Sequence, residues 1–163
     1  MSPLRPDLVE CWPFRVTGLG IEILLIRRAP DRSFAGMWQC VTGRLEGAET
    51  VVAAVFRELA EETGLGPPDV LALYSLDLVN TFFEPSANGI LVEPVFAVQV
   101  RTGWVPTISA EHDDQRWLGP DEARRLVVWP AYLTAIERIE TIVADGTRER
   151  WFRLRPDGTR MVD

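Results

Sequence analysis

Histidine and cysteine are scarce in this chain of 163 residues, which contains one histidine, His112, and two cysteines, Cys11 and Cys40. One histidine argues against a zinc site built from several histidines and against a phosphohistidine relay. The two cysteines lack the spacing of a metal site or a disulfide framework. We therefore predict that each is a small buried apolar side chain.

Long apolar runs are also absent, since no stretch approaches the roughly 18 residues that a membrane-spanning helix needs. Residues 1–9 contain no basic segment followed by an apolar one, so we predict no signal peptide. The chain has no internal repeat and no low-complexity tract. These absences favour a cytoplasmic globular protein without a membrane partner.

Positive charge is in deficit, because 17 Lys and Arg residues face 24 Asp and Glu residues, for a formal net charge of -7. Nucleic acid polymers and anionic membranes repel an acidic chain, which argues against both as partners. A phosphate substrate would need a cation between itself and the protein. The hydrophobic fraction of 47% is that of a folded chain, and the length predicts one domain over residues 1–163.

Hydropathy periodicity predicts an α+β fold in which a mixed sheet is combined with a few helices. Strands are expected at residues 14–26 (with a turn at 17–20), 37–42, 70–81, 90–100 and 115–118. Helices are expected at residues 50–63, 120–126 and 131–143, and Gly64 closes the first as a C-cap. The tail, residues 147–163, contains Trp151 and Phe152 and is expected to form a terminal hairpin on the domain.

The helix expected at 50–63 carries Glu58, Glu61 and Glu62 within an arc of roughly 100°. Like charges at this spacing repel, and the dipole of the helix disfavours negative charge in its last turns. A hard cation such as Mg²⁺ reverses the sign of both effects. Taken alone, the three glutamates also fit a solvated acidic face.

A longer motif surrounds these glutamates: Gly43, five residues, Glu49, seven residues, Arg57-Glu58-Leu59, one residue, Glu61-Glu62, one residue, Gly64-Leu65. It matches the Nudix box at every specified position, so the chain resembles the Nudix hydrolase superfamily over about residues 10–143, with the tail outside. Residues 38–43, Trp-Gln-Cys-Val-Thr-Gly, are similar to the branch that includes dihydroneopterin triphosphate diphosphatase.

The resemblance implies an α/β/α sandwich that uses Mg²⁺ or Mn²⁺ to hydrolyse a small phosphorylated metabolite. The favoured substrate is a nucleoside or pterin triphosphate, cleaved to a monophosphate and pyrophosphate. Nucleotide sugars, ADP-ribose and dinucleoside polyphosphates are the alternatives. An isoprenoid diphosphate isomerase is disfavoured by the single histidine, and a non-catalytic nucleotide-binding domain by the complete set of box glutamates. Either a monomer or a homodimer is compatible with the sequence.

By position, the resemblance implies that Glu58 and Glu62 are the principal metal ligands and that Glu61 is a further ligand or one that acts through a water molecule. The backbone carbonyl of Thr42 is implied as another ligand, at a place where the family more often has glycine. Arg57 and Glu49 are implied to tie the loop to the helix and to orient the ligands.

The segment at 109–118 resembles the Glu-His sequence before a Trp-Leu strand in the same branch, which implies that Glu111 is a ligand or the general base. A box glutamate is the alternative base, Asp113 or Asp114 could replace Glu111, and His112 is expected to be a loop residue. For the substrate, Arg27 and Arg28 are candidates for binding phosphate, and a surface position without contact to the substrate is the alternative. The candidates for stacking on a ring are Trp38, Phe82, Phe83 and Trp129, for which a place in the core is the alternative.

Overall fold

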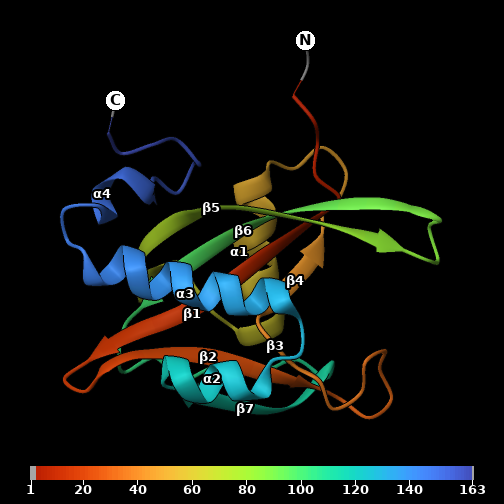
Figure 1. The fold of residues 1–163 in the computed structure, drawn as a ribbon, viewed down its shortest axis with the longest axis horizontal. Coiled ribbons are helices and arrows are strands. Elements are labelled where there is room, and N and C mark those ends of the chain that lie inside the picture. The colour runs from red at the N-terminus through yellow and green to blue at the C-terminus, as the bar shows by residue number, and fades with distance from the viewer. Residues whose placement is uncertain (1–2, 163) are drawn as a thin grey trace.

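In the computed structural model, which describes residues 3–162, an eight-stranded sheet lies between helices on its two faces (Figure 1). The predicted α/β/α sandwich is thereby confirmed. The strands are β1 (Leu8–Thr17), β2 (Gly20–Arg28), β3 (Trp38–Gln39), β4 (Val41–Arg44), β5 (Val70–Glu84), β6 (Gly89–Val100), β7 (His112–Leu118) and β8 (Arg153–Leu154). The helices are α1 (Val51–Thr63), α2 (Pro120–Leu126), α3 (Pro130–Ala144) and α4 (Glu149–Phe152), with a 3-10 turn, η1, at Pro67–Asp69.

The sheet is mixed, and β1 is its central strand. The order is β3-β2-β1-β6-β5-β8, with β4 paired to β1 and β7 paired to β2. β1 is antiparallel to β2 and β4 and parallel to β6. Because both faces of the sheet are covered, residues 9–14 of β1 are buried on both sides. None of the helices formed by residues 3–162 is both long and apolar enough to reach across a bilayer.

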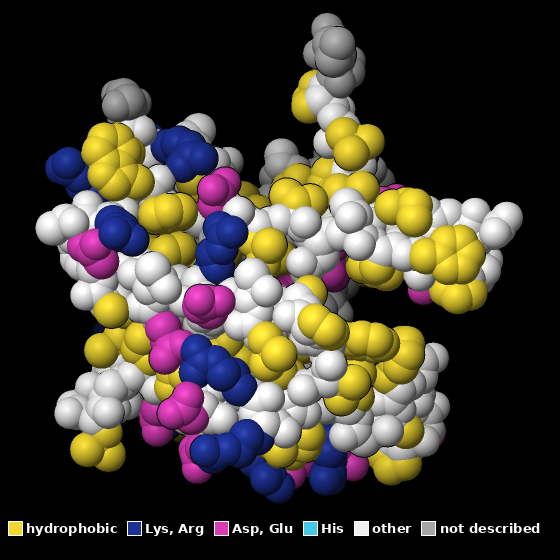
Figure 2. Space-filling view, viewed as in Figure 1, with side chains coloured by type: hydrophobic (Ala, Val, Ile, Leu, Met, Phe, Trp, Pro, Cys, Tyr) yellow, Lys and Arg dark blue, Asp and Glu magenta, His cyan; other side chains and the backbone are white. Residues whose placement is uncertain are grey.

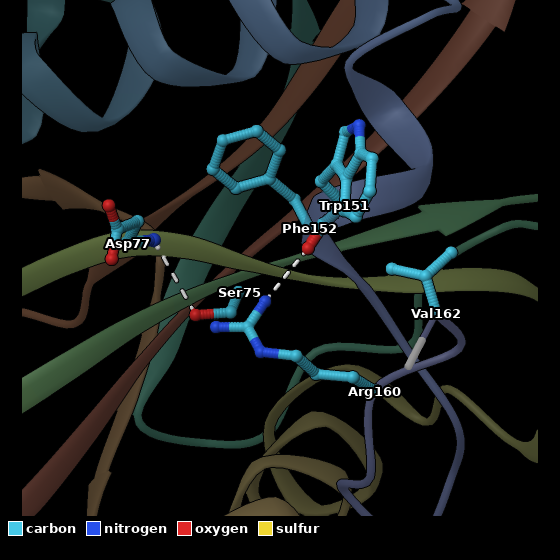
Figure 3. Close-up of a pocket in the computed structure, with 6 residues that line it drawn as sticks. All are labelled: Ser75, Asp77, Trp151, Phe152, Arg160 and Val162. Atoms are coloured by element: carbon cyan, nitrogen blue, oxygen red, sulfur yellow. Dashed lines mark hydrogen bonds between the residues drawn. The ribbon is translucent and has the colours of Figure 1, made fainter.

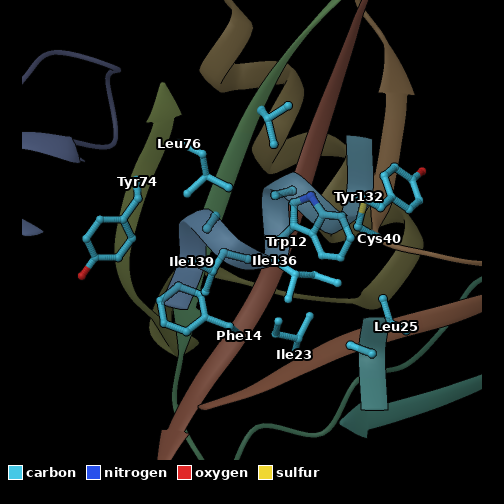
Figure 4. Packing of buried hydrophobic residues seen from close by; sticks show 14 of the residues in the cluster. Trp12, Phe14, Ile23, Leu25, Cys40, Tyr74, Leu76, Tyr132, Ile136 and Ile139 are labelled. Atoms are coloured by element: carbon cyan, nitrogen blue, oxygen red, sulfur yellow. The ribbon is translucent and has the colours of Figure 1, made fainter. Parts of the chain in front are cut away.

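Two hydrophobic clusters fill the space between the sheet and its helices. One lies under α2 and α3, where the Trp12 and Tyr132 rings meet edge to face with centroids 5.1 Å apart (Figure 4). The other lies under α1 and contains Val52, Val55 and Leu59. Both cysteines are buried, Cys40 in the first cluster and Cys11 in the second, as predicted.

The helix α1 has the boundaries that its sequence predicts. Thr50 is its N-cap, and the Thr50 side chain accepts a hydrogen bond from the backbone N–H of Ala53. Gly64 ends the helix in the left-handed region, at φ 71°, and donates its N–H to the carbonyl of Ala60. These caps set the bounds of α1, while Val52, Val55 and Leu59 pack on the sheet and so decide which way the box glutamates face.

Several predicted elements differ from the structure. The strand predicted to start at residue 14 begins at Leu8, because pairing with β4 and β6 extends it past the charged Glu10. The strand predicted at 37–42 is two short strands, since the chain passes from pairing with β2 to pairing with β1 at Cys40. His112 is the first residue of β7 and is buried, whereas a loop position was expected.

The tail forms a hairpin only in part. Trp151 and Phe152 lie in α4, and β8 then pairs with β5 at the edge of the sheet. A turn brings Arg160 back to pair with Leu154. A pocket of about 370 Å³ opens between the tail and β5, lined by Ser75, Asp77, Trp151, Phe152, Arg160 and Val162 (Figure 3). No box residue lines it.

Candidate active site

The second half of α1 places Glu58 against the start of the box. A Cβ added to Gly43 in β4 would lie 1.9 Å from Cδ and from Oε1 of Glu58. The Glu58 carboxylate therefore occupies the space that a side chain at position 43 would need. Glu58 itself is 9% exposed, so the apolar face of α1 and the glycine together hold an acidic group at the edge of the core.

Arg57 connects the loop before α1 to the carboxylates of the helix. Its Nη2 donates to Oε1 of Glu49 at 2.9 Å and to the carbonyl of Arg44 at 2.8 Å. Its Nη1 donates to Oε1 of Glu58 at 2.6 Å and to Oε2 of Glu61 at 3.2 Å. A single guanidinium thus bonds three carboxylates, because its planar fork presents several donors in fixed directions.

Glu62 is the least solvated of the box glutamates. It is 7% exposed, and its Oε2 has no hydrogen-bond partner among residues 3–162. Burial, followed by the charges of Glu58 and Glu111, raises the pKa of Glu62 to about 8. Burial also raises the pKa of Glu58, with Arg57 acting in the opposite direction. A buried carboxylate with an unused oxygen fits a hard divalent cation, which takes oxygen ligands.

Glu111 reaches this region through the loop that precedes β7. The backbone N–H of Thr107 donates to the carbonyl of Thr63 at 2.8 Å, and that of Ser109 donates to the carbonyl of Glu62 at 3.0 Å. These two bonds tie the loop to the end of α1. They bring Glu111 close enough to Glu62 for its charge to affect the Glu62 pKa.

Within residues 3–162, no three acidic, histidine or cysteine side chains converge closely enough to hold an ion as they stand. Glu58 and Glu61 are instead bonded to Arg57. The Glu61 side chain is 60% exposed, whereas Glu58 and Glu62 are buried. Thr42 lies in β4, and its backbone lowers the pKa of Glu62 through a hydrogen bond.

Of the predicted substrate residues, Arg27 and Trp38 are neighbours in the paired strands β2 and β3, whereas Phe82 belongs to β5. Arg27 forms an ion pair with Asp113 at 2.7 Å. Trp38 is only 9% exposed, and the guanidinium carbons of Arg27 and Arg116 lie 5.6 and 4.6 Å from its ring centroid. A base that stacked on this ring would have to displace those groups. Phe82 lies on the β5–β6 hairpin and is 38% exposed.

A notch opens between the projecting β5–β6 hairpin and the body of the molecule, and apolar side chains gather along both sides of it (Figure 2). The exposed apolar residues of the hairpin are Val79, Phe82, Phe83 and Ile90. Further exposed apolar residues are Phe34 in the loop between β2 and β3, Val128 and Trp129 just before α3, and Leu133 in the first turn of α3. The rings of Phe34 and Trp129 meet edge to face, with their centroids 5.9 Å apart.

A pair of buried acids on the α3 face of the sheet was not predicted from the sequence. Glu10 is 0% exposed and Glu93 is 7% exposed. The Trp12 indole and the Asn80 amide donate to the two oxygens of Glu10, at 2.5 and 2.8 Å. A glutamate within the apolar run of β1 was the signal for a buried, hydrogen-bonded carboxyl group.

Curated proteins match this chain over parts of its length. An octanoyltransferase of Myxococcus xanthus is 41% identical over 107 residues, which are 63% of this chain and 28% of that protein. An RNA pyrophosphohydrolase of Halorhodospira halophila is 45% identical over 52 residues, 32% of this chain and 26% of that protein. The chain thus spans about a quarter of the length of these relatives.

Solved structures share the fold over most of the chain. A C. elegans Ap4A hydrolase aligns with a TM-score of 0.71 at 16% identity, over 86% of this chain and 98% of that one. The E. coli dihydroneopterin triphosphate pyrophosphohydrolase aligns with a TM-score of 0.68 at 22% identity, over 82% of this chain and 94% of that one. The NUDIX domain of Shewanella oneidensis NrtR, complexed with ADP ribose, has a TM-score of 0.68 at 20% identity, over 87% of this chain and 90% of that one.

The family comparison agrees with the motif and with the fold. The model of the NUDIX domain matches residues 11–139, a range that includes the whole box and the Glu111 loop. Because this match covers well over half of the chain, the protein belongs to the NUDIX domain family.

Proposed function

We propose that the protein is a hydrolase of diphosphate linkages that depends on a divalent cation, Mg²⁺ or Mn²⁺. One observation carries the proposal: the buried Glu62 keeps an unpartnered oxygen beside the charges of Glu58 and Glu111. Carboxylates gathered in this way repel one another and are stabilised by a proton or a cation. A set of donors made only of oxygen favours a hard cation.

In this proposal, Glu58 and Glu62 are the principal ligands, and Glu61, Glu111 and the Thr42 carbonyl are further ones. Arg57 and Glu49 hold Glu58 and Glu61 in place through the bonds described above. A bound divalent cation lowers the pKa of its water and shields phosphate charge. That supply of positive charge also explains how a chain with a net charge of -7 accepts an anionic substrate.

The reaction is an attack of water on phosphorus, in which the bridging P–O bond breaks and pyrophosphate leaves. A carboxylate accepts the proton of the water. Glu111 is favoured over Glu62 for this role, because its side chain is 47% exposed and water can reach it. A box glutamate is the alternative base.

The proposed substrate is a nucleoside or pterin triphosphate, with the ring against Phe82 in the notch and Arg27 and Trp38 as further contacts. The likeness to dihydroneopterin triphosphate pyrophosphohydrolase supports this class. Dinucleoside polyphosphates, ADP-ribose or nucleotide sugars form the second candidate class, which the likeness to an Ap4A hydrolase and to a domain bound to ADP ribose supports. A cytoplasmic location and a monomeric or dimeric state remain predictions.

The test is a substrate panel with the full chain and Mg²⁺, containing nucleoside triphosphates, dihydroneopterin triphosphate, Ap4A and ADP-ribose. We expect one class to be cleaved, and we expect Glu58→Gln and Glu62→Gln to lower its turnover by more than about 100-fold. Glu22→Gln, which breaks an ion pair remote from the box, serves as the control. Cleavage that is unchanged in EDTA, or full turnover in both box variants, would overturn the proposal.

A further inference from the structure

The ends of β2 and β7 are out of regular register. Continuing the pairing beyond Arg27 would place Arg28 opposite Asp113, but Arg28 instead lies opposite His112. A bulge of this kind changes the direction of neighbouring side chains. Here it accompanies a contact between Arg28 and Glu111, the residue just before β7.

Arg28 and Glu111 are joined through both side chain and backbone. Nη1 of Arg28 donates to Oε2 of Glu111 at 2.8 Å, and the N–H of Ala29 donates to the carbonyl of Glu111 at 2.9 Å. Nε of Arg28 donates to the carbonyl of Ser33 at 3.2 Å. The Arg28 side chain is only 17% exposed. One arginine thus links the loop that carries Glu111 to the loop that follows β2.

The loop that carries Glu111 is tied to the end of α1, because the N–H of Ser109 donates to the carbonyl of Glu62 at 3.0 Å, and Arg28 bonds Glu111 two residues further along this loop. Arg28 is therefore close to the proposed cation site. A fixed positive charge at that place repels a cation. Arg28 therefore does not stand at this place to attract the metal. Its contacts with Glu111 explain its position instead.

We propose that Arg28 is the positioning residue for Glu111, holding the carboxylate and its loop beside Glu62 before the cation arrives. This inference rests on the proposed function, because it assigns Arg28 a role only through Glu111. An arginine suits the task because its fork donates to Ser33 and Glu111 at once, from Nε and Nη1. A lysine keeps the charge but offers a single ammonium group.

The test compares Mn²⁺ affinity, measured by calorimetry or from the EPR signal of free Mn²⁺, in the full chain without substrate. We expect Arg28→Gln and Arg28→Lys each to weaken binding by about 10-fold, as does loss of a group that orients a ligand. Glu111→Gln should weaken Mn²⁺ binding as well. Adding Arg28→Gln to Glu111→Gln should weaken binding by no more than about 2-fold further, because both changes break the same interaction. Arg15→Gln is the matched control, since Arg15 is 20% exposed and pairs with Glu22 far from the box.

The outcomes separate positioning from charge alone. If Arg28 acted only through its charge, Arg28→Gln would bind Mn²⁺ more tightly and Arg28→Lys would match the wild type, and either result overturns the inference. The inference is also overturned if the losses of Mn²⁺ affinity in Arg28→Gln and Glu111→Gln add fully when both changes are combined. Arg28→Lys keeps the test valid if Arg28→Gln does not fold. If Glu58→Gln and Glu62→Gln leave Mn²⁺ affinity unchanged, the proposed function fails instead.

Discussion

The carboxylate of Glu58 fills the space beside Gly43 so closely that a Cβ at residue 43 would lie 1.9 Å from its Oε1. This glycine is needed for space, because its φ does not lie in the left-handed region. The first residue of the box and the first glutamate of its helix therefore form one structural unit, although 14 residues lie between them in the chain.

Replacing Gly43 with alanine should displace Glu58 and leave the fold intact. The group in the way is the far end of a flexible side chain, which can turn aside at little cost in stability. We expect Mn²⁺ affinity to fall by about 10-fold or more, measured by calorimetry, with little change in melting temperature. Gly18→Ala is the control, because no atom lies within 4 Å of a Cβ at that position. Unchanged affinity in Gly43→Ala would show that Glu58 can move without loss.

Arg57→Lys should uncouple the carboxylates that Arg57 now bonds together. A lysine cannot donate at once to Glu49, Glu58 and Glu61 in the directions that the planar fork provides. We expect the metal concentration for half-maximal turnover to rise by about 10- to 100-fold. The measurement is a titration of turnover against Mg²⁺. A shift equal to that of Arg15→Gln would contradict the role given to Arg57.

Glu61 and Glu62 should differ in their importance even though they are adjacent. The Glu61 side chain is 60% exposed, while Glu62 is buried with one oxygen unpartnered. We expect Glu61→Gln to weaken Mn²⁺ binding by less than about 10-fold and Glu62→Gln to weaken it far more. Equal losses in the two variants would indicate that both glutamates are principal ligands.

The buried pair of Glu10 and Glu93 should make the protein less stable as the pH rises. Burial, followed by the charge of Glu93, raises the pKa of Glu10 from 4.5 to about 8. Between about pH 4.5 and pH 8, Glu10 therefore keeps its proton in the folded state, whereas it has lost that proton in the unfolded chain. Because the folded state binds more protons, the free energy of unfolding falls as the pH rises from about 4.5 to about 8.

Glu10→Gln should reduce this slope, because the amide does not titrate. The measurement is urea unfolding at about pH 5.5, 7 and 9 in EDTA, so that no metal adds to the effect. Glu62 also has a pKa of about 8 and contributes a slope of the same sign, so the slope should decrease rather than disappear. A slope identical to the wild type in both Glu10→Gln and Glu93→Gln would refute the assignment.

Local sequence patterns predicted α1 in full. Thr50, Gly64 and the apolar stripe act within a few residues of one another, so they mark the same boundaries in the sequence and in the structure. The box motif likewise predicted the family, because its spacing is set by a loop and by the turns of one helix. The glutamates at 58, 61 and 62 were correctly placed on one side of the helix, but their unequal burial was not foreseen.

What the sequence determined by itself is the set of local features: the caps, the helix, the box and its row of glutamates. Only the tertiary structure decided which glutamates are buried, how Arg28 contacts Glu111, and that Glu10 and Glu93 share one buried site. Each of these depends on pairing between strands that lie far apart in the chain. The physical reason is that a pKa, an ion pair or a buried oxygen depends on neighbours in space, and strand register is not encoded in any one segment.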